Sequence, residues 1–562
     1  MIWRFASTGL ILLVFSAFMP LPLTGNGVAV TALWWLVGMP VVNLVITWRG
    51  WAHRSWIVGL ICLMFAIDLG IQLVLRGFFG SLPQPYAIAE ALANTNAAEA
   101  LNFVQNQAHS LTLALVGGLV FWVIGWVEIQ LQNGRRQPQF ARVGRWTPHV
   151  FASHPKWRLS LRVLLVVFFI ALHFNPTMMR GHPLLRLPVL YERYVEARDA
   201  ISRMSEERQS FGSALRQQLS DADRAASHTA LEQAPIKILV IGESSNRDNW
   251  SLYGYSRDTT RPLDQLVVQN PKRFAIVRNA FSTHAFTAPS LTDAFVLPSA
   301  GKSKGYGIGG PDVFQVAQHL GYAVTWISNQ PKGDGWMAAL ANGADQRIFL
   351  NNGNWRDSSA QDTGLLTSIS QALDAPSDKA TLIVVHVLGQ HFHYDQRCPP
   401  NQQRYAEVKD AVTESLQVQG RKDWVIEQRN AYDSAVYCGA HFLADLLAMA
   451  DRAAMSARRP IDLLYFSDHG QEVGHNDDVA SHSSRYQSGY KIPVFKWSHR
   501  PLKSDTPSEF DQYFQMTQMP STILGFLEVK PAQFYRQRDD VFASGFQSVS
   551  PTVSEAKGLK GD

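Results

Sequence analysis

Three motifs after residue 235 carry side chains that could bind a metal ion and transfer a group. The tetrapeptide Ser-Asp-His-Gly at 467–470 follows an apolar run at 461–466, and Glu243 follows a similar run at 236–241. Carboxylate and imidazole groups placed where strands end are typical of a divalent-metal site in an α/β enzyme. Thr287 precedes Ala-Pro-Ser, which favours a helix start because proline is tolerated in the first turn.

These residue types together predict a metal-activated threonine nucleophile. A free hydroxyl is a poor nucleophile at neutral pH, and coordination to a divalent cation lowers its pKa. The N–H groups at a helix start also favour a bound phosphoryl oxygen. Thr287 is the preferred nucleophile, and Ser282, Thr283 and His284 are the alternatives in the same stretch.

The elements that must position these groups read as an open, mainly parallel α/β sheet. The strand-like runs are continuous rather than alternating, as expected for strands buried between helix layers. Helical patterns separate them. The predicted strands are 236–241, 322–327, 381–388 and 461–466, and the clearest helices are 311–320 and 428–452.

Polar side chains follow each predicted strand, at the edge where open α/β sheets bind ligands. They are Glu243, Ser328, Asn329, Gln390, His391, Asp468 and His469. Each has a purely structural alternative: Asp468 could cap a helix, and His469 could be a packed imidazole. His386 lies inside a strand run, which favours a core or supporting role. The gathering of all these residues at one edge favours a functional site.

The first part of the chain has the composition of a membrane domain. Of 562 residues, 46% are hydrophobic and only 17% charged, and the long apolar runs lie before about residue 175. Five segments are apolar enough to span a bilayer: about 5–20, 27–48, 55–77, 111–132 and 161–175. Cationic loops near 49–54 and at 133–162 belong inside, which places the segment after 175 outside. In a Gram-negative cell this predicts a multi-pass inner-membrane protein with a periplasmic domain.

We therefore expect four parts: a transmembrane domain at 1–175, interfacial or bridging helices at 176–230, a catalytic domain at 231–550 and a tail at 551–562. The segment 180–190 mixes apolar and cationic residues and suits the plane of the interface, although an ordinary linker is equally compatible.

The net charge of +5 does not indicate nucleic-acid binding, because the cations of 133–162 fit a cytoplasmic loop. Of the three cysteines, Cys62 lies in an apolar run. Cys398 and Cys438 could pair in an exported domain or remain as two free thiols, and the spacing leaves both open.

At these motifs the chain resembles the membrane-anchored phosphoethanolamine transferases of the alkaline phosphatase and sulfatase superfamily. Residues 242–259 are similar, without gaps, to the signature Gly-Glu-Thr…Ser-Leu-x-Gly-Tyr-x-Arg-[Asp/Glu]-Thr. Residues 430–437 are similar to its Asn-Ala-Tyr-Asp-Asn segment, and 467–474 to Ser-Asp-His-Gly-Glu-Ser-Leu-Gly. The cysteine pair that brackets the family's threonine is absent, which favours a cysteine-poor branch acting on another glycan than lipid A.

The resemblance implies an alkaline phosphatase-like fold and a specific set of site residues. One Zn²⁺ is expected, and a second is left open. The zinc ligands implied are Glu243, Thr287, Asp468 and His469. The implied contacts to substrate phosphate, to a second zinc ion or to the donor head group are His391, His482, Asn329 and Lys332, with His386 and His475 as weaker candidates.

The resemblance also implies the reaction and the partners. Thr287 would take phosphoethanolamine from phosphatidylethanolamine, releasing diacylglycerol, and pass it to lipopolysaccharide or another envelope glycan. A monomer is expected. Two alternatives stay open: phosphoglycerol transfer or phosphate or sulfate ester hydrolysis at the same metal site, and a non-catalytic membrane scaffold stabilised by zinc. A structural zinc site is usually closed by Cys and His, unlike this set.

Overall fold

The structure is a computed structural model of the whole chain. It describes residues 183–297, 310–330, 340–351, 361–484, 486–503 and 507–551, with a few isolated positions before 183. The chain divides into two compact units, Met1–Arg198 and Asp199–Asp562. The five predicted spans lie almost wholly outside the described residues, as does nearly all of the predicted tail. Among the helices that are described, none combines the length and the apolar character needed to cross a membrane.

An eight-stranded sheet forms the centre of the second unit, and it is mainly parallel as predicted. In spatial order the strands are β10 (Glu509–Gln515), β2 (Phe274–Phe281), β9 (Val494–Ser498), β6 (Ile461–Ser467), β1 (Ile236–Gly242), β5 (Thr381–His386), β3 (Ala323–Ser328) and β4 (Gln346–Phe349). Only β9 runs antiparallel to its neighbours, β2 and β6. A separate two-stranded sheet pairs β7 (Glu472–Val473) with β8 (Ala480–Ser481).

The central strands are those that the sequence predicts most clearly. Every residue of β1 is buried, because β1 pairs with β5 on one side and β6 on the other, between two helix layers. Gly242 ends β1 where a larger residue would clash with the Tyr465 phenol. The polar residues that follow β1, β5 and β6 therefore emerge at one edge of the sheet.

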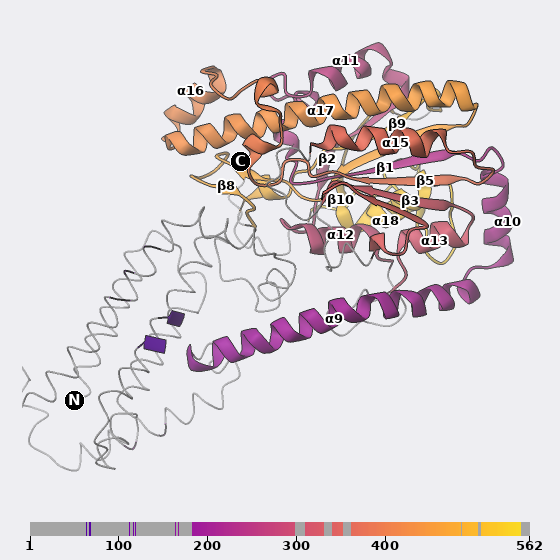
Figure 1. Cartoon of the computed structure of the whole chain (residues 1–562), viewed down its shortest axis with the longest axis horizontal. Helices are drawn as coiled ribbons and strands as arrows, with labels where there is room; N and C mark the ends of the chain where they lie inside the picture. The colour runs from indigo at the N-terminus through magenta and orange to yellow at the C-terminus, as the bar shows by residue number, and fades with distance from the viewer. Residues whose placement is uncertain are drawn as a thin grey trace, which may run out of the picture. The chain divides into compact units, whose positions relative to one another are not determined.

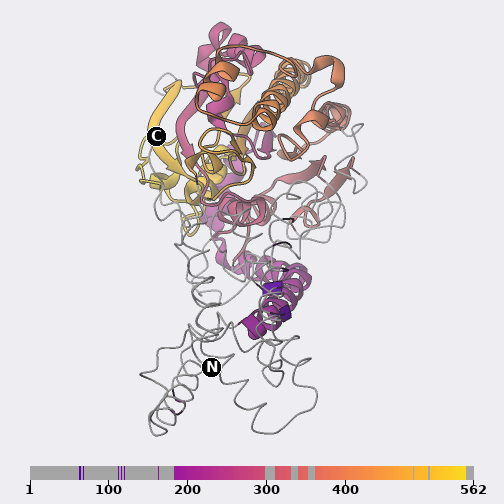
Figure 2. The same cartoon turned by 90° about the vertical axis from the view of Figure 1, so that its left-hand side faces the viewer.

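Helices cover both faces of the sheet (Figure 1). On one face α11 (Arg261–Gln269), α15 (Leu365–Asp374) and α17 (Asp423–Ala457) pack over one apolar core. On the other, α12 (Thr287–Phe295), α13 (Val313–His319) and α18 (Met519–Phe526) pack over a second core. α13 falls within the predicted helix 311–320, and α17 extends the predicted 428–452 at both ends. Figure 2 shows the yellow C-terminal segment, which includes the edge strand β10, at one side of this domain.

Two helices precede the sheet, α9 (Pro183–Gln218) and α10 (Asp221–Ala230), within the segment predicted to bridge the two parts. Ser220 and Asp223 form a reciprocal capping box at the start of α10. Arg208 of α9 pairs with Asp312, with Nε 2.7 Å from Oδ2. Asp312 is also the N-cap of α13, so this carboxylate fastens α9 to the sheet-covering layer.

Cys398 and Cys438 form a disulfide with 5.6 Å between their Cα atoms, a usual separation for the bond. The structure therefore selects the paired alternative that the sequence left open. The bond joins the loop after β5 to α17, and it is of the kind that persists in oxidising compartments.

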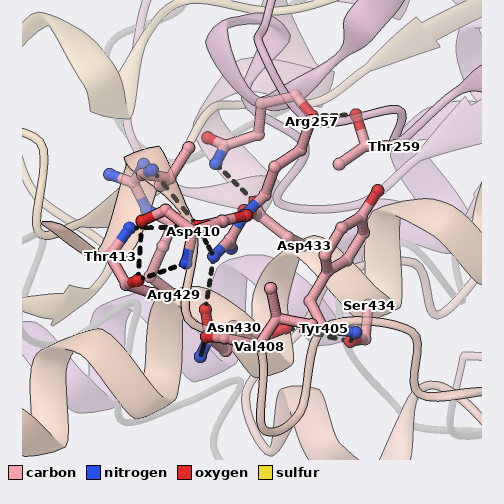
Figure 3. A network of polar contacts seen from close by, with 12 residues as sticks. Arg257, Thr259, Tyr405, Val408, Asp410, Thr413, Arg429, Asn430, Asp433 and Ser434 are labelled. Atoms are coloured by element: carbon pink, nitrogen blue, oxygen red, sulfur yellow. Dashed lines mark hydrogen bonds and ion pairs between the residues drawn. The ribbon is translucent and has the colours of Figure 1, made fainter. Parts of the chain in front are cut away.

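A buried ionic network ties the loop after β1 to α17 (Figure 3). The Arg257 guanidinium lies with Nη1 2.6 Å from Asp433 Oδ2 and Nε 2.9 Å from Asp410 Oδ2. Its Nη2 also donates to Asn430 Oδ1 at 2.8 Å. Asp433 is fully buried and accepts a further bond from the Tyr255 hydroxyl. Such a pair is costly to break, because removal of one partner leaves the other charge buried.

We expect Asp433→Ala to lower the free energy of unfolding by about 3 kcal/mol. This value is at the lower end for breaking a buried ion pair, because Arg257 would retain its ion pair with Asp410. The matched control is Asp258→Ala. Asp258 pairs with Arg261 at 3.7 Å in an exposed position, so its loss should cost less than about 1 kcal/mol. Urea unfolding of the full-length protein in detergent measures both. Equal losses would show that the buried network adds no more than a surface pair.

Candidate metal centre

The ends of β1 and β6 bring the two predicted acidic ligands side by side. Gly242 pairs in register with Ser467, so Glu243 and Asp468 leave adjacent strands at the same level. The Asp468 N–H donates to the Gly242 carbonyl at 3.1 Å, which extends the pairing by one residue. Both carboxylates are buried.

An imidazole pair completes a compact cluster of potential ligand atoms. The donor atoms of Glu243, His469 and His482 all lie within 4.8 Å of one another. His469 Nε2 lies 3.6 Å from Glu243 Oε1 and 3.3 Å from Asp468 Oδ2. The rings of His469 and His482 meet edge to face with centroids 4.5 Å apart. Carboxylate oxygens and imidazole nitrogens therefore converge on one small space.

The charges in this space favour a cation. Burial, followed by the nearby Asp468 carboxylate, raises the pKa of Glu243 well above its usual value. Within the described residues, Asp468 Oδ2 is buried without a hydrogen-bond partner. Two adjacent buried carboxylates repel each other unless a positive charge lies between them. The residues therefore fit a divalent metal, and the mixture of nitrogen and oxygen donors suits zinc.

The orientation of His469 agrees with a ligand role. Its Nδ1 lies 2.7 Å from the Gly470 carbonyl oxygen, an acceptor, so Nδ1 carries the proton. The other ring nitrogen, Nε2, lies next to Glu243 Oε1 and Asp468 Oδ2. This arrangement, in which one ring nitrogen is fixed by a backbone carbonyl, is common for metal-binding histidines.

Thr287 begins α12 and presents its hydroxyl to the same cluster. Thr287 Oγ1 lies 3.4 and 3.3 Å from the two carboxylate oxygens of Glu243 and 3.4 Å from His469 Nε2. The three alternatives make other contacts. Thr283 Oγ1 donates to Asp293 at 2.7 Å, Ser282 Oγ donates to the His284 carbonyl at 2.8 Å, and His284 Nε2 lies 3.5 Å from Asp293 Oδ2.

The remaining predicted residues divide into those near the cluster and those away from it. His391 lies near, with its ring centroid 6.2 Å from that of His482. Burial, then Arg397, lowers the pKa of His391 to about 3, so the ring is neutral at pH 7. Lys332 lies outside the described residues.

Three predicted residues make other contacts. Asn329 Nδ2 donates to Asp362 Oδ1 at 2.8 Å. His386 is the last residue of β5, where burial lowers its pKa to about 4 and its ring packs against Trp326. His475 Nε2 lies 2.9 Å from Asn249 Oδ1 in the loop after β1. These three support the surrounding loops, and none supplies a donor atom to the cluster of Glu243, His469 and His482.

Sequence reasoning missed two residues that touch Glu243. Gln330 Nε2 lies 3.4 Å from Glu243 Oε2 and donates to the Val387 carbonyl at 2.9 Å. Ser244 Oγ donates to Glu243 Oε1 at 2.7 Å. The hydroxyl next to a proposed ligand was a usable signal for Ser244. Nothing local distinguishes Gln330 from any other loop amide.

Comparison with known proteins places this fold and site in a class. The family model "Sulfatase" matches residues 235–529, so the chain belongs to the sulfatase family, within the alkaline phosphatase and sulfatase superfamily. The matched range begins one residue before β1 and ends after α18, so it contains all eight strands of the central sheet and all residues of the cluster.

One curated relative indicates the kind of enzyme that this chain resembles. The chain is 29% identical over 282 residues to the phosphoethanolamine transferase EptC of Escherichia coli (strain K12), which covers 49% of this chain and 47% of that protein. The chain thus spans about half the length of the curated relatives it matches.

Two solved structures share the fold. One is the C-terminal periplasmic domain of EptC from E. coli in complex with Zn, with a TM-score of 0.51 and 25% identity over 57% of this chain and 88% of that one. The other is the integral membrane protein lipooligosaccharide phosphoethanolamine transferase A from Neisseria meningitidis. Its TM-score is 0.50 with 16% identity, over 97% of this chain and 96% of that one. This second likeness is one of fold, and it extends over nearly the whole chain.

Proposed function

We propose that this protein transfers phosphoethanolamine from phosphatidylethanolamine to lipopolysaccharide or another envelope glycan. The observation that carries the proposal is the position of Thr287, whose hydroxyl lies within 3.4 Å of Glu243 and His469 at the start of a helix. The similarity to EptC supports the choice of transferred group.

The proposed ligands of one zinc ion are Glu243, Thr287, Asp468 and His469. His482 lies close enough to add a donor to the same ion, or to hold the substrate phosphate or a second ion with His391. When bound, zinc would lower the pKa of the Thr287 hydroxyl and offset the charge of the two carboxylates.

The reaction has two steps in which this chain's residues bind, orient and move protons. First, Thr287 Oγ1 forms a bond to phosphorus, and the bond from phosphorus to the diacylglycerol oxygen breaks. The threonine proton ends on the departing diacylglycerol. Second, an acceptor oxygen forms a bond to phosphorus, the bond to Thr287 breaks, and the acceptor proton returns to the threonine.

The surrounding groups suit these steps. Thr287 and Ala288, the first two residues of α12, carry backbone N–H groups that would favour a bound phosphoryl oxygen. Burial lowers the pKa of His391 and of His482, so both rings are neutral at pH 7, and a neutral imidazole can accept a hydrogen bond from the threonine or acceptor hydroxyl. Lys332, and the Asn329 loop, are proposed to contact the donor head group.

The proposed setting is the inner membrane of a Gram-negative cell, with residues 231–550 forming a periplasmic catalytic domain. Residues 1–175 would form a five-span membrane domain, 176–230 the bridging helices, and 551–562 a tail. The Cys398–Cys438 disulfide supports an oxidising compartment. Since one chain supplies every residue of the cluster, a monomer suffices for the reaction.

Intact-mass analysis tests the covalent step. Full-length protein in detergent with zinc is exposed to phosphatidylethanolamine without acceptor, then digested and mapped around Thr287. We expect a phosphoethanolamine adduct on Thr287 and release of diacylglycerol. A phosphoglycerol adduct after exposure to phosphatidylglycerol would instead identify the alternative donor. No adduct from either lipid, with turnover of a simple phosphate or sulfate ester, would overturn the transferase assignment in favour of hydrolysis.

A further inference from the structure

Ser244, the residue after Glu243, has an unusual backbone conformation. Its φ is +55°, in the left-handed region that residues with a Cβ rarely adopt. Ser244 is also fully buried. A strained backbone of this kind persists only where surrounding contacts hold it, and such residues cluster at functional sites.

The strained conformation lets Ser244 bond to both buried carboxylates. Its N–H donates to Asp468 Oδ1 at 2.9 Å, and its Oγ donates to Glu243 Oε1 at 2.7 Å. Beside these bonds, Asp468 Oδ2 lies 3.3 Å from His469 Nε2, and Glu243 Oε1 lies 3.6 Å from the same nitrogen. Ser244 thus bonds to carboxylates that follow two different strands, and the His469 N–H adds a bond of 2.7 Å to Asp468 Oδ1.

A single phenol on α17 holds Ser244 in place. The Tyr432 hydroxyl donates to the Ser244 carbonyl at 2.7 Å and accepts from the Asn246 N–H at 2.8 Å. Tyr432 is fully buried, and its ring packs edge to face against Tyr394. The hydroxyl therefore satisfies two backbone groups on either side of the turn, and no water is needed to do so.

The neighbouring residue of α17 fixes the same loop a second time. Asp433 Oδ1 accepts from Asn249 Nδ2 at 2.8 Å, and Asp433 also pairs with Arg257 in the network of Figure 3. The loop after β1 is thus held by two consecutive side chains of one long helix. Tyr432 acts at the end of the loop nearest the carboxylates, and Asp433 at its middle.

We propose that Tyr432 and Ser244 are positioning residues for the metal centre. The Tyr432 hydroxyl fixes the left-handed backbone of Ser244, and Ser244 orients the Glu243 and Asp468 carboxylates before a metal ion binds. The proposal rests on the metal centre of the proposed function, but it does not depend on the donor or the acceptor. Partners that orient metal ligands in this way typically contribute about 10- to 100-fold to metal affinity.

The first test removes one hydroxyl and measures zinc binding. Full-length Tyr432→Phe in detergent is titrated with zinc against a chromophoric chelator. We expect the zinc dissociation constant to rise about 10- to 100-fold. The matched control is Tyr322→Phe, because the Tyr322 hydroxyl is equally buried and donates to the Leu527 carbonyl at 2.7 Å, remote in sequence from every cluster residue. This control should bind zinc as the wild type does.

A second set of variants separates the hydroxyl of Ser244 from its backbone. Ser244→Gly accepts the left-handed conformation and keeps the N–H bond to Asp468, but it loses the bond to Glu243. Ser244→Ala loses the same bond and keeps the strain. We expect both to weaken zinc binding, with Ala the weaker of the two. Ser434→Ala, which removes a buried serine hydroxyl from α17 that bonds to Asn430 and Tyr405, should leave zinc affinity unchanged.

The outcomes are distinct. Wild-type zinc affinity in Tyr432→Phe, or an equal loss in Tyr322→Phe, would overturn the positioning role. Weakened zinc binding in Tyr432→Phe together with no lipid-derived adduct in the wild type would uphold the positioning role and overturn the proposed reaction instead. A wild-type protein with no zinc affinity in the titration would overturn both.

Discussion

Replacing Thr287 with alanine is expected to abolish transfer and to weaken zinc binding, because it removes one of the four proposed ligands, while leaving the fold in place. Thr287 occupies the first position of α12 and is half-buried, so loss of its hydroxyl removes no core contact. Loss of a nucleophile typically lowers turnover by many orders of magnitude, and we expect at least about a 1,000-fold fall in kcat/KM. Release of diacylglycerol from labelled phosphatidylethanolamine measures the effect.

The same helix supplies a matched control. Thr292 Oγ1 donates to the Ala288 carbonyl one turn earlier, at 2.7 Å, and touches no cluster residue in the described contacts. Thr292→Ala should therefore keep activity within about twofold of wild type, as expected for a local bond away from the reacting atoms. Thr287→Ser retains a hydroxyl and should retain measurable transfer. If Thr287→Ala transferred phosphoethanolamine at the wild-type rate, Thr287 would not be the nucleophile, and the proposed covalent mechanism would be wrong.

Removal of the metal ion is expected to reduce transfer activity about as much as the Thr287→Ala substitution does. Treatment with a chelator should reduce transfer to background, since Glu243 and Asp468 would then lie adjacent without a cation and the Thr287 pKa would return to its ordinary range. Zinc should restore activity and magnesium should not, because imidazole ligands suit zinc whereas magnesium prefers oxygen.

Elemental analysis of two histidine variants tests where the zinc ion binds. His469→Ala should lose zinc, because its Nε2 faces the two carboxylates. His319→Ala removes an imidazole from α13 whose Nδ1 lies 2.8 Å from the Gln315 carbonyl oxygen, and it should retain zinc in full. Equal zinc content in both variants would place the ion elsewhere, and activity that survives exhaustive chelation would exclude a metal-activated threonine.

The central strands that the sequence predicted differ in their surroundings from the edge strand β10, which it missed. β1, β5 and β6 are central and buried on both faces, so their apolar runs are continuous and easily recognised. β10, with the sequence Glu-Phe-Asp-Gln-Tyr-Phe-Gln, is an edge strand whose first half is largely exposed. Its polar composition is compatible with a loop, and only its pairing with β2 makes it a strand.

Some residues of the candidate site could be predicted from the sequence, and others could not. Residues whose role follows from their place at a strand end, Glu243, Asp468 and His469, were accessible to sequence reasoning. Tyr432 was not, because its contact with Ser244 spans 188 positions in the chain. The segment at 430–437 resembles a family motif, but a motif match gives no partner. The Cys398–Cys438 pair was undecided for the same reason, since only the fold brings the two Cα atoms within 5.6 Å.

The order of the strands bears on when the proposed metal ion would first bind during synthesis. β1 lies between β5 and β6, and its first residue, Ile236, pairs with Thr381 and Ile461. Closing such long loops is slow, because their entropy is lost before the contacts form. About 225 residues must emerge after Glu243 before Asp468 and His469 can join it, so a nascent chain that ends earlier lacks the complete set of proposed ligands. Zinc retention would thus report that the domain has finished folding, and a truncated chain ending before β6 would not compete for the ion.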